Sequence, residues 1–210
     1  VVLEEPTHLS YPQVFKFNDE YWMIPESSAS GKVYLYRAQQ LPGPWSRTAE
    51  LLSSPHVDST IFLFEGFWYL WATDSQNCLR LYFSRELSGA YAEHPSSPIS
   101  SDLRFVRCGG RVQFLPNVGL VRLAQDGTEG YGKYLHLMLI KQLTPEKYKE
   151  ELINTDILPR DQIWNKDGGH HIDLIQFQGK NILAIDGRTS DSYWNIPARI
   201  FWGLFRRIFN

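Results

Sequence analysis

The sequence has few of the residues that cross-link small folds or bind metals. Its 210 residues include only two cysteines, Cys78 and Cys108, which form neither a disulfide framework nor a Cys-x-x-Cys motif. No His-Glu-x-x-His or His-x-His spacing occurs, which argues against a zinc site. We therefore expect the thiols to be buried or idle, and we predict no cofactor.

The sequence also lacks strong charge and long apolar runs. Its formal net charge of −2 indicates no basic face, so nucleic acid is not an expected partner. No apolar run reaches the roughly 20 residues that span a bilayer. With 43% hydrophobic and 14% aromatic residues, the chain can instead build the core of one globular domain.

A repeat runs along most of the chain. Phe17, Phe64, Phe114 and Phe177 each end an apolar strand that a polar turn connects to a second strand. Their spacings of 47, 50 and 63 residues resemble the roughly 40–50 residues of a propeller blade. The sequence predicts an all-β fold, a β-propeller over residues 1–191 with four blades present of a probable five. The alternative, a β-sandwich, has no reason to keep this register.

Three segments depart from the repeat. Residues 144–152 begin with Thr and Pro and predict a short helical insert in the third blade. Val1–Pro6 is interpreted as the outer strand of an earlier blade, so a first blade is expected to be missing. Residues 192–210 form a separate tail that predicts a basic amphipathic helix. This helix would contact a membrane peripherally, or pack on the propeller or a neighbouring domain.

Polar side chains recur at two positions of the predicted blades. The start of each inner strand carries one of Tyr11, Asp58, Cys108 and His171. The end of each second strand carries one of Glu26, Thr73, Asp126 and Asp186. Because equivalent strand ends open on one face of a propeller, we expect these side chains to converge at one mouth of the central channel.

The carboxylates at these positions are the candidate catalytic residues: Glu26, Asp58 and Asp186. Asp58 starts an apolar strand, where a carboxylate must be paired or hydrogen-bonded. Glu26 and Asp58 could form the glycosidase pair, which lies roughly 5–5.5 Å apart for retention and 6.5–9.5 Å for inversion. The alternatives are a strand-start cap for Asp58 and a solvated loop carboxylate for Glu26.

Cationic side chains near the same positions are candidate ligands. Arg111 alternates onto the same face as Gly109 and could hold a substrate carboxylate or phosphate, whereas Arg122 is expected to pair with an acid and join two blades. His170 and His171 point to opposite faces of a strand, so one of them would face the channel. A divalent cation near His171 is compatible with this arrangement. The candidate substrate-binding residues are His8, Tyr11, Arg107, Arg111, Gln125, Asp126, His171 and Arg188.

Several segments occur in a characteristic order: His8-Leu-Ser-Tyr-Pro12, Asp58-Ser-Thr-Ile-Phe62, Gly109-Gly-Arg111, His170-His171 and Ile185-Asp-Gly-Arg188. This succession, over about residues 1–188, resembles the N-terminal domain of the glucosamine inositolphosphorylceramide transferases and bacterial relatives. The resemblance implies a five-bladed propeller of the arabinanase, β-xylosidase and invertase type. The family's first blade, with its early Asp-bearing strand, and its separate glycosyltransferase domain are absent from this sequence.

The resemblance implies a carbohydrate-recognising domain associated with a sugar-transferring or sugar-modifying enzyme. Its partners would be a saccharide or glycolipid headgroup and a neighbouring glycosyltransferase domain. The compartment would be the Golgi lumen for a plant-like protein and the cytoplasm for a bacterial-like one. Two alternatives stay open: a glycoside hydrolase that uses Glu26 and Asp58, and a propeller that binds protein partners. The ring of ionisable residues argues against the last, because protein-binding faces need aromatic and aliphatic anchors.

The missing first blade generates a prediction about the isolated chain. A blade face without its neighbour would expose more than the few hundred Å² of apolar surface that monomers tolerate. We expect the 210-residue chain to self-associate, which light scattering would detect as a mass above that of one chain. A stable monomer would contradict this expectation.

Overall fold

The computed structural model describes residues 1–177 and 179–189, which fold almost entirely into antiparallel β-sheets. The first sheet contains β1 (Ser10–Phe17), β2 (Glu20–Glu26), β3 (Val33–Ala38) and β4 (Ser46–Leu52). The second contains β5 (His56–Phe64), β6 (Phe67–Asp74), β7 (Leu79–Ser84) and β8 (Ala92–Glu93). A short 3-10 helix, Ser28–Ser30, follows β2.

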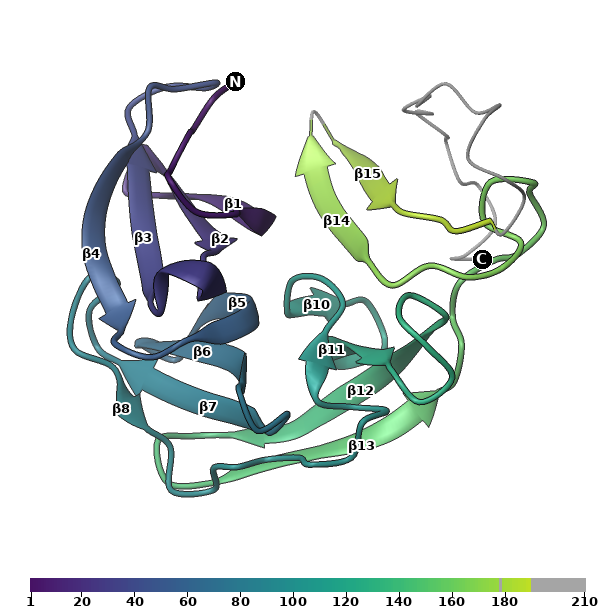
Figure 1. Ribbon diagram of the computed structural model, residues 1–210. Helices are drawn as coiled ribbons and strands as arrows, with labels where there is room; N and C mark the ends of the chain where they lie inside the picture. Colours follow the sequence, from purple (N-terminus) through teal and green to yellow (C-terminus); the bar gives the residue numbers. More distant parts are fainter. Residues whose placement is uncertain (178, 190–210) are drawn as a thin grey trace.

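The third sheet contains β9 (Arg107–Cys108), β10 (Gln113–Leu115), β11 (Gly119–Asp126), β12 (Tyr134–Leu143) and β13 (Tyr148–Asn154). Within the described residues, the fourth sheet contains β14 (Ile172–Phe177) and β15 (Lys180–Ile185). Figure 1 shows the four sheets arranged around a common centre, with β1, β5, β10 and β14 innermost. This is the radial arrangement of propeller blades, and the sandwich alternative is excluded.

The repeated hairpins follow from turn chemistry. Phe17 and Phe64 end β1 and β5, and each is paired with the first residue of the next strand. The turn residues between them, Asn18-Asp19 and Glu65-Gly66, all have positive φ, from 48° to 79°. Two-residue turns of this kind match the right-handed twist of a hairpin. The same turn therefore places the inner strand of both blades in the same register.

Apolar side chains fill the space between neighbouring blades. Ile24 and Leu35 of the first blade pack in one cluster with Ile61 and Leu70 of the second. A second cluster joins the second and third blades and includes Trp71, Leu79, Leu81, Cys108, Val112 and Leu120. The core is therefore a series of inter-blade layers, with the inner strand ends left to carry polar side chains.

A buried ion pair joins strands of the third blade. The Arg122 side chain is 0% exposed, and its Nε and Nη2 donate to the Glu150 carboxylate at 2.9 and 2.5 Å. Tyr148 also donates to Glu150, at 2.6 Å, and accepts a bond from Trp71 Nε1 in the second blade. Arg122 is thus paired with an acid, as expected. The acid lies in the same blade, however, and the hydrogen bond from Trp71 to Tyr148 joins the third blade to the second.

The predicted helical insert over residues 144–152 is wrong. Thr144 instead closes a tight turn, in which its Oγ1 accepts a bond from Lys147 N at 3.0 Å, and β13 begins at Tyr148. Tyr148 and Glu150 lie two residues apart on β13, so their side chains share one face of the strand. On that face Tyr148 contacts Trp71 and Glu150 contacts Arg122. These long-range contacts override the local signals for a helix.

The interpretation of Val1–Pro6 as a strand is also wrong, because no strand precedes Ser10. Glu5 lies against the first blade, where it accepts a hydrogen bond from the Tyr36 hydroxyl at 2.9 Å and lies 3.7 Å from Arg47. The predicted tail helix over residues 192–210 lies outside the described residues.

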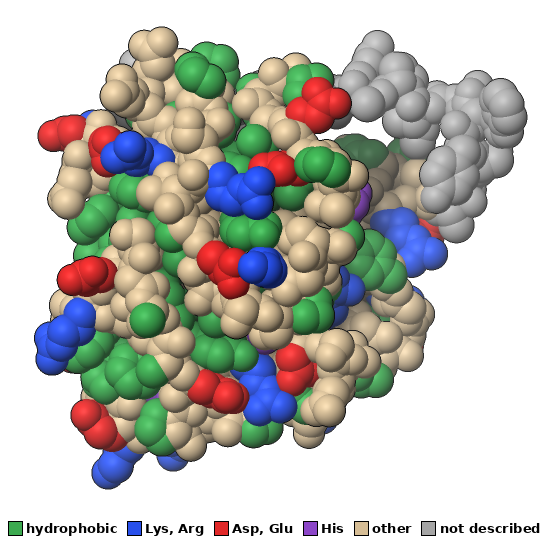
Figure 2. Space-filling view, turned by 60° about the vertical axis from the view of Figure 1, so that its left-hand side comes forward, with side chains coloured by type: hydrophobic (Ala, Val, Ile, Leu, Met, Phe, Trp, Pro, Cys, Tyr) green, Lys and Arg blue, Asp and Glu red, His purple; other side chains and the backbone are tan. Residues whose placement is uncertain are grey.

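The surface agrees with the balanced composition. Figure 2 shows basic and acidic side chains interspersed over one face, without a large area of one sign. Among the described residues, no helix is long and apolar enough to cross a bilayer.

The buried Arg122–Glu150 pair should carry much of the third blade's stability. Arg122→Met leaves Glu150 buried without its partner, so we expect a loss of about 3–5 kcal/mol in the free energy of unfolding. Lys141→Met is the matched control, because the Lys141–Glu151 pair is 46% exposed on both sides. Its cost should stay below about 1 kcal/mol. Equal losses in chemical denaturation would contradict this assignment.

Candidate functional site

The inner strands of the first two blades begin with the same irregularity. Tyr11 and Asp58 have φ of 44° and 50°, and each lies where the strand pairing shifts register. A bulge of this kind re-aims a side chain and often lies next to functional sites. The Tyr11 hydroxyl accepts a bond from Gly110 N at 2.7 Å, across to the third blade. Gly110 also lies against the fourth blade. A Cβ at this position would lie 1.9 Å from the Ile172 carbonyl oxygen, so only glycine fits there.

Asp58 is the centre of a polar cluster drawn from three blades. Its side chain is buried, and Oδ2 accepts hydrogen bonds from Arg107 Nε at 2.6 Å and Gln125 Nε2 at 3.1 Å. Its backbone N–H donates to Glu26 Oε2 at 3.3 Å. β9 and β11 position Arg107 and Gln125 as direct partners in the ladder. The structure therefore brings together Glu26, Asp58, Arg107 and Gln125.

Burial dominates the electrostatics of this cluster. It raises the pKa of Asp58 to about 6, although Arg107 opposes the shift, and the nearby Glu26 carboxylate raises it further. Burial also disfavours the charged form of Arg107, but the Asp58 carboxylate outweighs this and raises the pKa of the guanidinium. Asp58 thus exchanges its proton near neutral pH, as functional carboxylates often do.

A second cluster joins the third and fourth blades. The Tyr131 hydroxyl lies 2.6 Å from His170 Nε2, and His170 Nδ1 is paired with Asp186 Oδ2. Asp186 Oδ1 accepts the backbone N–H groups of His170 and His171 at 2.9 and 2.7 Å. Burial raises the pKa of Asp186, but the pairing with His170 and these backbone bonds outweigh it, so the pKa is lowered.

The two clusters are continuous. The Arg107 guanidinium lies over the Tyr131 ring, 5.5 Å from its centroid. Arg188 Nη1 donates to the Tyr131 carbonyl at 2.6 Å. A polar network therefore extends from Glu26 in the first blade to Asp186 and Arg188 in the fourth. This network, with the residues named above, is called the mouth network below.

Arg111 lies outside the mouth network. Its guanidinium forms a bidentate pair with Asp173 and also donates to the Val14 carbonyl at 3.2 Å. It lines a shallow depression next to Tyr11 and His171, whose rings meet edge to face at 5.0 Å. Burial lowers the pKa of His171. Arg111, predicted as a cation near the channel mouth, is thus paired with Asp173, and the cation beside Asp58 is Arg107.

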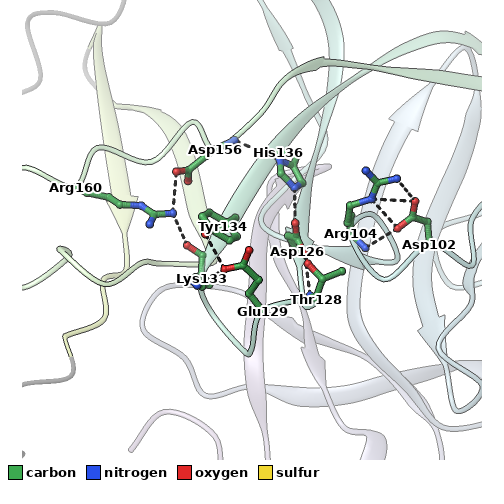
Figure 3. Close-up of polar contacts among 10 residues, drawn as sticks. All are labelled: Asp102, Arg104, Asp126, Thr128, Glu129, Lys133, Tyr134, His136, Asp156 and Arg160. Carbon is green, nitrogen blue, oxygen red and sulfur yellow. Dashed lines mark hydrogen bonds and ion pairs between the residues drawn. The ribbon is translucent and has the colours of Figure 1, made fainter.

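Asp126 is also placed elsewhere. Figure 3 shows its carboxylate between Thr128 and His136, and His136 Nε2 lies 3.0 Å from Asp126 Oδ2. Gln125 points to Asp58, and adjacent residues of a strand face opposite sides, so Asp126 must point away from the mouth. His8 is exposed and precedes β1, and no hydrogen bond or ion pair joins it to the mouth network among the described residues.

Tyr131 is the mouth residue that sequence reasoning missed. It lies in the turn between β11 and β12, between Gly130 and Gly132, which both have positive φ. The Gly-Tyr-Gly sequence was the available signal, since glycines on both sides allow the backbone of the turn to adopt positive φ. No group of three His, Cys, Asp or Glu side chains in residues 1–177 and 179–189 could hold a metal ion. The structure gives no support for a cation near His171.

Comparison with known families gives this site its context. The family described as "Glucosamine inositolphosphorylceramide transferase 1, N-terminal" matches residues 1–188. The chain belongs to this family. Proteins named glucosamine inositolphosphorylceramide transferase 1 from Oryza sativa subsp. japonica and Arabidopsis thaliana are 34% identical to it over 200 residues. The matches cover 89% of this chain but only 27% and 26% of those proteins, so the chain spans about a quarter of their length.

Solved structures confirm the fold of this transferase-family domain. A thermostable family-43 glycoside hydrolase matches with a TM-score of 0.62 at 14% identity, over 88% of this chain and 66% of that one. An α-L-arabinofuranosidase from Podospora anserina matches with a TM-score of 0.60 at 14% identity, over 81% and 60%. The predicted propeller and the predicted family are therefore both confirmed. The functional roles assigned to individual mouth residues stay predictions.

The cluster around Asp58 predicts a specific titration. NMR of the Asp58 carboxyl carbon should give a pKa of about 6, and Arg107→Gln should raise it further by removing the cation. The folded pKa lies above the ordinary value of 3.8, so the folded state binds the proton more tightly. The free energy of unfolding should therefore fall as pH rises from about 4 to 6.

Arg104→Gln is the control for this titration, because Arg104 pairs with Asp102 in an exposed contact. It should leave the Asp58 pKa unchanged. A carboxyl that titrates near 4 in the unsubstituted protein would contradict the effect of burial.

Proposed function

We propose that this domain binds a saccharide or glycolipid headgroup at the mouth network, for a sugar-transferring enzyme of which it forms part. The observation that carries the proposal is the unused bonding capacity of the Asp58–Arg107 pair. Both bonds to Asp58 fall on Oδ2, and Arg107 uses only Nε in this pair. Asp58 Oδ1 and the Arg107 Nη groups have no partner among the contacts of the described residues. A ligand at the mouth could satisfy them.

The chemistry of these groups suits a sugar. Vicinal hydroxyls both donate and accept hydrogen bonds, so a fixed carboxylate oxygen beside a guanidinium can bind two of them at once. The same guanidinium could hold a phosphate bidentately. Relatives are named glucosamine inositolphosphorylceramide transferase 1, and glucosamine and an inositol phosphate carry these two kinds of group. We therefore propose a headgroup of this chemistry as the ligand.

A glycoside hydrolase is the second candidate. The raised pKa of Asp58 suits a general acid, and glycoside hydrolases share the fold. Against this, the Glu26 carboxylate already accepts a hydrogen bond from the Asp58 backbone N–H at 3.3 Å. Because this bond engages Glu26 with the backbone of Asp58, we favour binding over bond cleavage. Hydrolysis of aryl glycosides that is lost in both Glu26→Gln and Asp58→Asn would reverse this preference.

The proposal extends to the surroundings of the domain. The saccharide would be passed to a glycosyltransferase domain, and the basic tail over residues 192–210 would contact the membrane that holds a glycolipid. The plant-like compartment would be the Golgi lumen. These three statements stay predictions.

Binding is tested by isothermal titration with methyl β-glucosaminide and myo-inositol 1-phosphate. Asp58→Asn keeps the shape of the side chain but removes its charge, so affinity should fall about 10- to 100-fold. Asp102→Asn is the matched control, because the Asp102 carboxylate pairs with Arg104 in an exposed contact outside the mouth network. We expect its affinity to equal that of the unsubstituted protein.

Two results would overturn the proposal. One is the absence of binding of either probe to the unsubstituted protein. The other is an Asp58→Asn variant that binds normally but melts at a much lower temperature, which would make Asp58 a structural cap.

A further inference from the structure

Tyr131 is exposed to solvent, yet several contacts restrain its side chain and its backbone. Its side chain is 59% exposed. Yet its hydroxyl is bonded to His170, its carbonyl accepts from Arg188, and its ring lies against the Arg107 guanidinium. An exposed aromatic side chain normally keeps its rotamer freedom, because ordering it costs entropy. Here that cost is already met before any ligand arrives, which is the arrangement of a pre-organised binding group.

The backbone of this turn is fixed as well. Gly130 and Gly132 have φ of 112° and 72°, so Tyr131 sits between two residues in conformations that glycine favours. Across the blade boundary, a Cβ at Gly168 would lie 2.5 Å from the Gly132 carbonyl. The backbone of the turn at Gly132 therefore packs directly against the backbone at Gly168, which leads into the fourth blade. It holds the Tyr131 ring beside His170.

The hydrogen-bond partners define where the protons lie. Asp186 is ionised, because its pKa is lowered, and it can only accept. The Nδ1 atom of His170 therefore carries the proton that Asp186 accepts, and in the neutral ring Nε2 is an acceptor. In this neutral form of His170, Tyr131 donates its hydroxyl proton to Nε2, whereas a doubly protonated ring would donate to the phenol oxygen. The lone pairs of the phenol oxygen stay available to a ligand at the mouth.

We propose that Tyr131 is a ligand-contacting residue of the mouth and that His170 and Asp186 are positioning residues that fix its hydroxyl as a hydrogen-bond acceptor. A saccharide hydroxyl would donate to the phenol oxygen while the Asp58–Arg107 pair binds its neighbours. This assignment rests on the proposed function, since it names further residues of the same site. A ligand group that can only accept hydrogen bonds would not bind at the phenol oxygen. Tyr131 would therefore select for ligands with a donor at this position.

The first measurement needs no ligand. In ¹⁵N NMR of the imidazole groups, neutral His170 should carry its proton on Nδ1. Asp186→Asn replaces an obligate acceptor with an amide that can donate, so we expect the proton to move to Nε2. A neutral His170 protonated on Nε2 in the unsubstituted protein would overturn the proposal. A purely structural Asp186 would change the melting temperature but not the tautomer.

The second measurement is the affinity for whichever of methyl β-glucosaminide and myo-inositol 1-phosphate binds. Tyr131→Phe keeps the ring and its contact with Arg107 but removes the hydroxyl, so affinity should fall about three- to tenfold. Tyr134→Phe is the matched control, because the Tyr134 hydroxyl bonds to Glu129, outside the mouth network. It should bind normally.

The two proposals fail in different ways. If neither probe binds, the proposed function fails, and the imidazole signals alone decide whether Asp186 orients His170. If a probe binds and Asp58→Asn weakens it while Tyr131→Phe does not, the saccharide site stands and the role of Tyr131 is overturned.

Discussion

The buried carboxylate of Asp58 is the constraint around which the mouth is built. A charge at a position that is 4% exposed is costly unless cations and donors compensate it. Arg107 and Gln125 provide that compensation from a neighbouring blade. The position of the third blade relative to the second is therefore tied to the charge of one residue. Arg107 in turn orients Tyr131, through which the fourth blade joins the network.

Two different kinds of interaction thus hold the blades together. Apolar layers such as the cluster around Trp71 and Leu79 pack the middle of neighbouring blades. Hydrogen bonds between side chains of different blades join the strand ends at the mouth. Apolar packing tolerates small shifts, whereas bonds such as Arg107 to Asp58 fix a geometry. The combination gives a scaffold packed by apolar layers, whose polar end is held by directional hydrogen bonds and ion pairs.

The sequence predicted the parts of the fold that local chemistry decides. The hairpins around Phe17 and Phe64 were predictable because their turns contain residues that accept positive φ. The site was predicted only in part. Arg107 and Arg111 were both predicted ligands, but alternation favoured Arg111 for the channel face. Gly110, with φ of 148°, separates β9 from β10 and interrupts that alternation. Residues 144–152 were assigned to a helix because contacts with Trp71, far away in the chain, cannot be found in local propensity. Tyr131 was missed because its role depends on a histidine in another blade.

The bond between Tyr11 and Gly110 spans 99 residues of sequence. Contacts of such separation form only after the chain between them has collapsed, since loop closure must precede them. During synthesis, Tyr11 leaves the ribosome long before its partner, and His170 and Asp186 follow later still. The first two blades can then pair their own strands while the mouth stays unformed. Ligand binding at the proposed site would therefore require all four described blades to be in place, and a nascent chain that lacks the last blade would not recognise the ligand.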